Sequence, residues 1–344
     1  MSRIISSYIR MFYKAFKGEI LVLPSRTIAL LFGAFLFLLP LRVGSYTLFV
    51  LTFANVFVIF AVSWDLLSGY TGQVNFGHAA FFGVAAYAAA LLNLHLGFSP
   101  WVTIPIGAIV AVAVGLLIGV PCLRLRGSYL ALATLAFPII LSGLVFVFPD
   151  WTGGEYGLRV SPLSSSRQVN YYSSLLLMLG AAFVMYKITD SKIGIIFHAI
   201  REDEIAARTC GINTTFYKLV AFSLSGFFAG IAGGYYAHLL RVANFNMFSV
   251  NMSFQPIIWT VFGGITTIYG AIGGTYLLYS LPEILHLEQV KFLIIAGVTV
   301  FVMLFMPEGI FNWIRDKIEK ECPRCKKRNV ATRELCRVCG AALD

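Results

Sequence analysis

Long apolar stretches fill this chain, and they limit the folds that it can adopt. A helix that crosses a bilayer needs about 20 apolar residues. Because lipid offers no partner for exposed backbone groups, such stretches span as helices. The sequence therefore predicts an all-α integral membrane protein of about ten transmembrane helices, some broken or re-entrant. The candidates are Arg26–Leu39, Tyr46–Leu67, Asn75–Leu96, Trp101–Val120, Ser128–Phe148, Tyr171–Thr189, Phe216–Leu240, Phe254–Tyr269, Ala271–Leu285 and Val290–Met306.

One polar segment, Asp190–Gly211, interrupts the apolar pattern. An ionised side chain in the bilayer core costs at least ~2.5 kcal/mol, so this segment must lie in water. We expect a helix over residues 195–210, ended by Gly211 as a C-terminal cap. Its charges either dock in a partner protein or are simply solvated. The residues concerned are Arg201, Glu202, Asp203, Glu204 and Arg208.

The basic residues predict the topology. The net charge is +10, and Lys and Arg gather in the N-terminus, the short loops and the C-terminal tail. This distribution is typical of cytoplasmic segments and does not indicate a nucleic-acid surface. We expect a cytoplasmic amphipathic segment over residues 1–25, a transmembrane domain over 26–307, and both termini in the cytoplasm. The glycine-rich run between Phe254 and Leu285 is the weakest step, because one helix there would place the tail outside.

The tail contains two C-x2-C pairs, Cys322 with Cys325 and Cys336 with Cys339. This spacing is close to that of four-thiolate zinc ribbons, which are usually structural. We therefore expect a structural zinc ribbon over residues 321–344, preceded by a cytoplasmic linker helix over 308–320. Disulfides and an iron site are the alternatives.

Glycine and polar residues are unusually dense in Trp64–Ala90. Broken backbone at membrane depth is tolerated where it is buried in protein or lines a wet cavity. Glycine-interrupted segments point to binding sites in transporters, although close helix packing would explain them too. His78 fits a packing histidine equally well. The candidate pathway residues are Gly69, Gly72, Gln73, Asn75, Gly77 and His78, with Gly263 and Gly264 from a second glycine-rich run.

The chain has no evident energy source of its own. Its apolar stretches hold few ionisable groups, notably Asp65 and Glu283 near helix ends, and the sequence has no GxxxxGK[ST] phosphate loop. We therefore expect a non-enzymatic membrane protein whose motor lies in partner subunits.

Several motifs in register resemble one known family. They are GYTGQVNFGHAAFFGVAAYAAALL, LRLRGSYLALATLAF, TGGEYGL, and SKIGxxxxAIREDEIAARxxGIN followed by YKLVAFxLSGFFAGIAGGYYA. Together they resemble the branched-chain amino acid permease family of ABC importers over about Leu66–Pro307. The similarity is closest to the second of that family's two permease partners, the one with the LRLRG element.

The resemblance implies a transmembrane permease subunit in the plasma (inner) membrane. Its partners would be a second homologous permease, two cytoplasmic ABC ATPase subunits that hydrolyse ATP, and an extracytoplasmic substrate-binding protein. Branched-chain or similar small amino acids would be the cargo. Residues 199–211 would be the coupling helix, with Glu202 and Glu204 as candidate ATPase contacts. Two features depart from the pattern: the cysteine-rich tail, and Glu155 and Tyr156 where relatives often have Pro and Asn.

Two other classes of function remain open. An ion-coupled secondary transporter would need no ATPase. A membrane-anchored interaction protein would use the zinc ribbon as its working part.

Overall fold

The computed structural model describes residues 24–122, 125, 127–286, 291–325, 328–336 and 338–343. The chain divides into a central unit, Gly44–Gly309, and a terminal unit made of the two ends of the chain up to Val43 and from Ile310. The predicted amphipathic segment over residues 1–25 falls almost wholly outside the described residues.

The central unit is helical, as predicted. Its long helices are α3 (Ser45–Trp64), α4 (His78–Leu96), α5 (Pro100–Cys122), α6 (Ser128–Val147), α8 (Arg167–Thr189), α11 (Thr214–Leu240), α12 (Val250–Gly263) and α15 (Lys291–Phe305). Shorter helices are α7 (Pro149–Thr152), α9 (Lys192–Glu202), α10 (Glu204–Thr209), α13 (Ile268–Thr275) and α14 (Leu281–Ile284). The 3-10 turns are η4 (Gly154–Tyr156) and η5 (Phe245–Phe248), and the π-helical turns are η3 (Asp65–Gly69) and η6 (Tyr276–Ser280).

The length and composition of these helices agree with a multi-pass membrane protein. Among the described residues, six helices are long and apolar enough to cross a membrane alone. The number rises to eight if two bent helix pairs, Val250–Gly263 with Ile268–Ile284 and Leu293–Phe305 with Ile310–Ile318, each form one span. The count is roughly that of the predicted fold.

Helix α3 forms the core of the central unit. Its most apolar window is 89% buried, against 22% for α6, so α3 is enclosed by protein while α6 keeps a wide exposed face. Helices α4, α5 and α11 pack closely on one another. Small residues permit this approach, because a Cβ on Gly230 would lie 2.8 Å from the Cα of Ala108.

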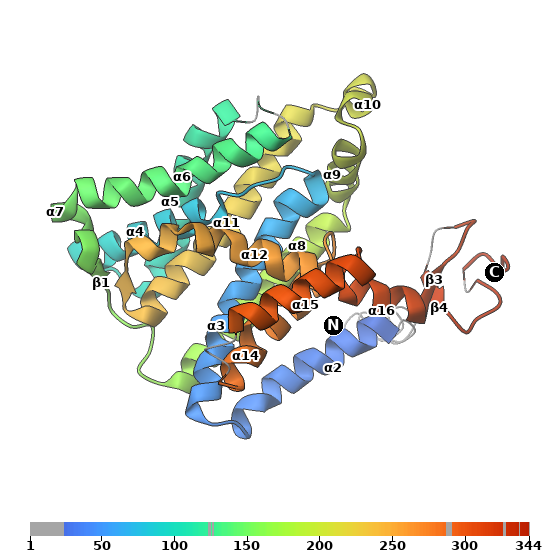
Figure 1. Ribbon diagram of the computed structural model, residues 1–344, viewed down its shortest axis with the longest axis horizontal. Coiled ribbons are helices and arrows are strands. Elements are labelled where there is room, and N and C mark those ends of the chain that lie inside the picture. Colours follow the sequence, from blue (N-terminus) through green and yellow to red (C-terminus); the bar gives the residue numbers. More distant parts are fainter. Residues whose placement is uncertain are drawn as a thin grey trace, which may run out of the picture. The chain divides into compact units, whose positions relative to one another are not determined.

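Connecting segments gather at two opposite ends of the central unit. At one end, strand β1 (Leu158–Arg159) pairs antiparallel with β2 (Val242–Ala243), and the backbone N–H of Ser161 donates to Asn93 Oδ1 over 2.9 Å. Helices α9 and α10 lie at the opposite end from α7 and β1 (Figure 1). Three long helices, α5, α6 and α8, separate the end of α4 beside β1 from α9, and this odd number of crossings agrees with the opposite positions of the two ends.

The glycine-rich run turns back earlier than the sequence predicts. We expected segments at Phe254–Tyr269 and Ala271–Leu285, but α12 ends at Gly263 and α13 begins at Ile268. The two helices are bent by 113° at this break. The reason is local, because Gly264 and Thr266 both adopt positive φ, 126° and 65°, which an α-helix cannot contain. Two separate helices, and not one, therefore occupy the run.

The terminal unit has a helical and a cysteine-rich part. It contains α2 (Pro24–Leu38), the 3-10 turn η2 (Leu39–Leu41) and α16 (Ile310–Ile318), which lies within residues 308–320, where a linker helix is predicted. Strand β3 (Glu319–Glu321) pairs antiparallel with β4 (Arg328–Val330). A further bridge joins Leu335 to Ala342, so the last residues fold back on themselves around the cysteines.

Candidate functional site

An extended, partly buried segment lies between η3, which continues α3, and α4. The sequence predicts a helix from Asn75, but α4 begins at His78 and no helix is assigned over residues 72–77. The reason lies in Gly72, whose φ of +70° turns the chain back toward the interior, and in the side-chain hydrogen bonds that replace helical ones. Within this segment Gln73 and Asn75 are buried. The predicted break is therefore present, with Gln73, Asn75 and Gly77 buried and Gly72 and Val74 exposed.

Side chains satisfy the backbone of this segment. Trp64 Nε1 donates to the Asn75 carbonyl over 2.7 Å, and Ser68 Oγ donates to the Gln73 carbonyl over 3.0 Å. The N–H of Phe76 donates to Thr134 Oγ1 over 3.1 Å, and that of Gly77 to Asn75 Oδ1 over 2.8 Å. Each bond removes the penalty of an unpaired backbone group in a low-dielectric interior.

Gly77 and His78 hold the start of α4 in place. A Cβ on Gly77 would overlap the carbonyl oxygen of Thr134, so α6 approaches the backbone closely there. His78 is fully buried, with its ring stacked on Phe60 at 4.8 Å between centroids and Nε2 2.9 Å from Ser63 Oγ. His78 thus has the partners of a packing histidine.

A cleft opens beside the extended segment. Its apolar walls come from α4, α5, α6 and α11, including Phe81, Val114 and Phe222. Asn75, Gly77 and Thr134 also line this cleft, and an adjoining smaller hollow, lined by Gln73, shares Asn75, Thr134 and Phe222 with it. The cleft thus joins apolar walls to a few polar groups, an arrangement that is usual for sites of small amphipathic molecules.

The second glycine-rich run meets the first at Asp65. The backbone N–H of Thr266 donates to Asp65 Oδ1 over 2.9 Å, and a Cβ on Gly69 would lie 3.1 Å from Ile265 Cγ2. Gly309 packs directly on Gly264. Of the predicted pathway residues, Gly69, Gly263 and Gly264 therefore lie at this junction, while Asn75 and Gly77 line the cleft and Gln73 lines the adjoining hollow.

The predicted helix over residues 195–210 is two helices. Asp203 is extended between α9 and α10, and its Oδ1 accepts from the N–H groups of Ile205 and Ala206 over 2.8 and 3.0 Å. This carboxylate makes Asp203 the N-cap of α10 and explains the break. Gly211 follows α10 with φ +83°, and the Ile212 N–H donates to the Ala207 carbonyl, so Gly211 is the predicted C-terminal cap.

Glu204 is turned toward the protein. Its Oε1 lies 2.8 Å from Arg208 Nη2, and its Oε2 lies 2.6 Å from Lys218 Nζ on α11. Thr214 Oγ1 accepts from Arg208 Nε over 2.8 Å and donates to Glu204 Oε1 over 3.3 Å. Because the side chain of Glu204 is only 18% exposed, this network anchors α10 to α11.

Other residues of α9 and α10 face outward. Arg201, Glu202 and Asp203 are exposed, and Ile205 is 64% exposed. Ile205 thus lies exposed beside the charged side chains of Arg201, Glu202 and Asp203. Glu202 and Glu204, both predicted as candidate ATPase contacts, therefore lie in different environments.

This surface touches the buried segment directly. The rings of Tyr70 and His198 pack edge to face at 5.2 Å, and a Cβ on Gly72 would lie 3.2 Å from Arg201 Cγ. Burial lowers the pKa of His198, the positive charge of Arg201 lowers it further, and Glu202 opposes them. Because the pKa is lowered from its ordinary value near 6.5, the neutral form of the imidazole is favoured at pH 7.

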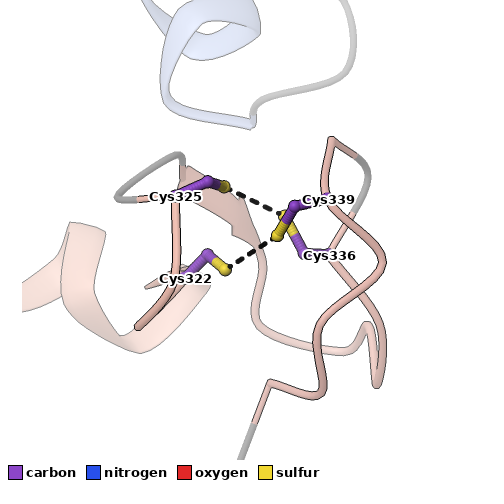
Figure 2. Close-up of side chains that lie close together, drawn as sticks. All are labelled: Cys322, Cys325, Cys336 and Cys339. Carbon is purple, nitrogen blue, oxygen red and sulfur yellow. Dashed lines mark hydrogen bonds between the residues drawn. The ribbon is translucent and has the colours of Figure 1, made fainter.

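The four tail cysteines form one cluster. Their sulfur atoms all lie within 4.8 Å of one another, with Cys322 and Cys339 at 3.5 Å and Cys325 and Cys336 at 3.5 Å (Figure 2). Backbone N–H groups of Cys339 and Val338 lower the pKa of the Cys336 thiol to about 6. Four converging soft donors could hold a metal ion. Among the described residues this is the only such group of cysteine, histidine and carboxylate side chains.

Sequence patterns missed the supporting residues. Trp64, Ser68 and Thr134 hold the extended segment, and Lys218 and Thr214 hold Glu204. Only Ser68 and Trp64 had a signal, because they fall in the polar, glycine-rich run itself. The others lie on distant helices, so tertiary packing alone brings them to the site.

Comparisons with known proteins agree with this architecture. Residues 46–306 match the model of the family described as "Branched-chain amino acid transport system / permease component". The high-affinity branched-chain amino acid transport system permease protein LivM of Salmonella typhimurium is 28% identical over 83% of this chain and 75% of its own length. LivM of Escherichia coli is 29% identical over 81% of this chain and 73% of its own. The autoinducer 2 import system permease protein LsrC of Escherichia coli is 26% identical over 76% and 80%.

Proposed function

This chain belongs to the family of permease components of branched-chain amino acid transport systems, and on that premise we propose that it carries branched-chain or similar small amino acids. It is a transmembrane permease subunit of an ABC importer and a multi-pass protein of the plasma membrane. It is not an enzyme. It works with ATPase and substrate-binding partners, which supply the motor and the solute.

The cargo follows from similarity and from the cleft. The family model over residues 46–306 and the similarity to the two LivM proteins support amino acids as the cargo. Aliphatic and aromatic walls suit a branched side chain, and Gln73, Asn75 and Thr134 suit its charged ends. In this proposal Gln73, Asn75 and Gly77 line the route. Gly69, Gly263 and Gly264 permit its helices to shift at the Asp65 junction, and His78 holds the start of α4.

The proposal that this chain couples to an ATPase subunit rests on one observation, the exposed surface of α9 and α10. It lies at the end of the central unit and contacts the buried segment through Tyr70 and Gly72. We assign Arg201, Glu202, Asp203 and Ile205 to docking on an ATPase subunit. Nucleotide-driven closure of two ATPases on a pair of homologous permeases would then move the segment and switch access.

The same geometry supports the orientation of the chain. Gly309 packs on Gly264, which is joined through Thr266 and Asp65 to the end that carries α9. The chain therefore leaves the central unit on the α9 side. If that side docks the ATPases, the tail is cytoplasmic, and a reducing cytoplasm favours thiolates over disulfides. We propose a structural zinc ion at Cys322, Cys325, Cys336 and Cys339, bound through four sulfurs.

The test uses the importer purified with its partner subunits and reconstituted in liposomes. Uptake of labelled leucine should require ATP and should fall when valine or isoleucine competes. Glu202→Lys combined with Ile205→Asp should release the ATPase. Glu155→Lys combined with Tyr156→Asp, at two exposed residues between α7 and β1 at the opposite end of the central unit, is the matched control. Retention of the ATPase by the double variant would refute the docking surface. Gradient-driven uptake without ATP would favour the secondary transporter, and absence of any flux would favour the interaction protein.

A further inference from the structure

We propose that Glu204, Lys218 and Gln73 form a transmission line that carries movement of α10 to the polar wall of the cleft. This proposal rests on the proposed function, because it assumes that closure of the ATPase subunits moves α9 and α10. It assigns positioning roles to Glu204 and Lys218, and it separates Glu204 from the docking residues.

The first link joins α10 to α11. Lys218 Nζ lies 2.6 Å from Glu204 Oε2, with the two side chains 13% and 18% exposed. An ion pair shielded from water in this way is held more firmly than an exposed pair, and removing one partner strands a charge. Glu204 Oε1 is held by Arg208 and Thr214, so both carboxylate oxygens are engaged. A displacement of α10 must therefore move the first turns of α11.

The second link joins α11 to the buried segment. Gln73 Nε2 donates to the Lys218 carbonyl over 3.4 Å and to Thr71 Oγ1 over 3.1 Å. Lys218 thus contacts α10 through its ammonium group and the extended segment through its backbone. Only this one residue separates the charged surface helix from a side chain that lines the hollow beside the cleft.

The amide oxygen of Gln73 is buried and, within the described part of the chain, unpaired. Gln73 is 4% exposed, and its Oε1 has no hydrogen-bond partner among the residues that the structure describes. A buried acceptor left unpaired costs about 1–3 kcal/mol. Because Nε2 fixes the plane of the amide, a shift of Lys218 reorients Oε1. An ammonium or amide N–H of the solute would pair with Oε1 in one position of α11 and not in the other.

A purely structural brace is the competing explanation. Such a brace would affect stability and assembly but would leave the ratio of solute transported to ATP hydrolysed unchanged. The transmission line predicts the opposite, because a broken link lets the ATPase run without moving the route. The ratio therefore separates the two explanations.

The experiment measures that ratio in the reconstituted importer for Glu204→Gln, Lys218→Met and Gln73→Leu. Each variant should lower the ratio of solute transported to ATP hydrolysed by about fivefold or more, while the ATPase stays bound. Fivefold corresponds to the lower limit of typical coupling free energies. Glu155→Gln makes the same chemical change at an exposed glutamate outside the docking surface and is the matched control, so its ratio should stay unchanged. Lys218→Arg keeps the cation and should restore the ratio that Lys218→Met loses.

Combining Glu204→Gln with Gln73→Leu tests whether the residues act in one line. The double variant should be no worse than the more severe single variant, because the link is already broken. Effects that multiply, an unchanged ratio in Glu204→Gln, or release of the ATPase by Glu204→Gln would each overturn the proposal. Failure of the docking surface appears separately, as retention of the ATPase by the Glu202→Lys and Ile205→Asp variant. Should Lys218→Met fail to fold, Gln73→Leu and Glu204→Gln decide the question.

Discussion

Trp64 Nε1 donates a hydrogen bond of 2.7 Å to the backbone carbonyl of Asn75, across the turn that separates α3 from α4. Trp64 is 4% exposed, so this bond forms in an interior without bulk water. It ties the non-helical segment to the most buried helix of the central unit. The position of the polar cleft wall thus depends on an indole that does not itself line the cleft.

Replacing Trp64 with Phe should destabilise the protein. The variant leaves the Asn75 carbonyl without its donor, which costs about 1–3 kcal/mol. We expect a lower melting temperature of the purified protein in detergent. Trp259→Phe is the matched control, since Trp259 is equally buried and packs on Phe57 and Tyr279 through its ring. Equal losses in the two variants would show that ring volume, and not the hydrogen bond, matters at Trp64.

Gly77→Ala should damage the cleft more than alanine at other membrane glycines. The added methyl group would overlap the Thr134 carbonyl, and overpacking of this kind costs about 1–3 kcal/mol or more. Gly180→Ala, on α8, meets no atom within 4 Å and is the control. Melting temperature and leucine uptake should both fall for Gly77→Ala only. Normal uptake in that variant would mean that α6 can move away from the segment without consequence.

The membrane architecture could be predicted because its physics is local. Apolar length predicts spanning helices, and the charges of Asp190–Gly211 predict that this segment lies in water. The Gly211 cap was predictable for the same reason, as positive φ favours glycine. Even the break near Gly72 followed from glycine and polar residues at a depth where helices are usual.

The environment of each side chain could not be predicted in this way. Glu202 and Glu204 are two residues apart and chemically identical, yet one is exposed and the other is held by Lys218 and Arg208. That difference arises because Asp203 breaks the helix and turns α10 toward α11. The turn at residues 264–267 depends likewise on Asp65, about 200 residues earlier in the chain. Periodicity and spacing contain no information on such long-range contacts.

Metal content tests the cysteine cluster. Purified protein should hold one zinc ion per chain, and Cys322→Ser combined with Cys336→Ser should release it, because two soft ligands of four are lost. Cys210→Ser, at an exposed cysteine of the central unit, should leave the metal bound. Elemental analysis by mass spectrometry gives the identity and amount. An iron signal would favour the iron alternative, and loss of free thiols without any metal would favour disulfides.

Asp65→Asn separates an ATP-driven importer from an ion-coupled carrier. Asp65 is fully buried, and a carrier that moves protons or sodium through the protein would depend on such a carboxylate. In the importer, Asp65 instead holds the turn at Thr266 by accepting its N–H through Oδ1. Asparagine keeps that acceptor oxygen without the charge, so ATP-driven uptake of leucine should persist. Asp65→Leu removes the acceptor, strands the Thr266 N–H and should cost about 1–3 kcal/mol of stability. If Asp65→Asn abolished leucine uptake at a normal melting temperature, Asp65 would instead be assigned to ion coupling. Leucine uptake that responds to a proton or sodium gradient in the unsubstituted protein would support the same assignment.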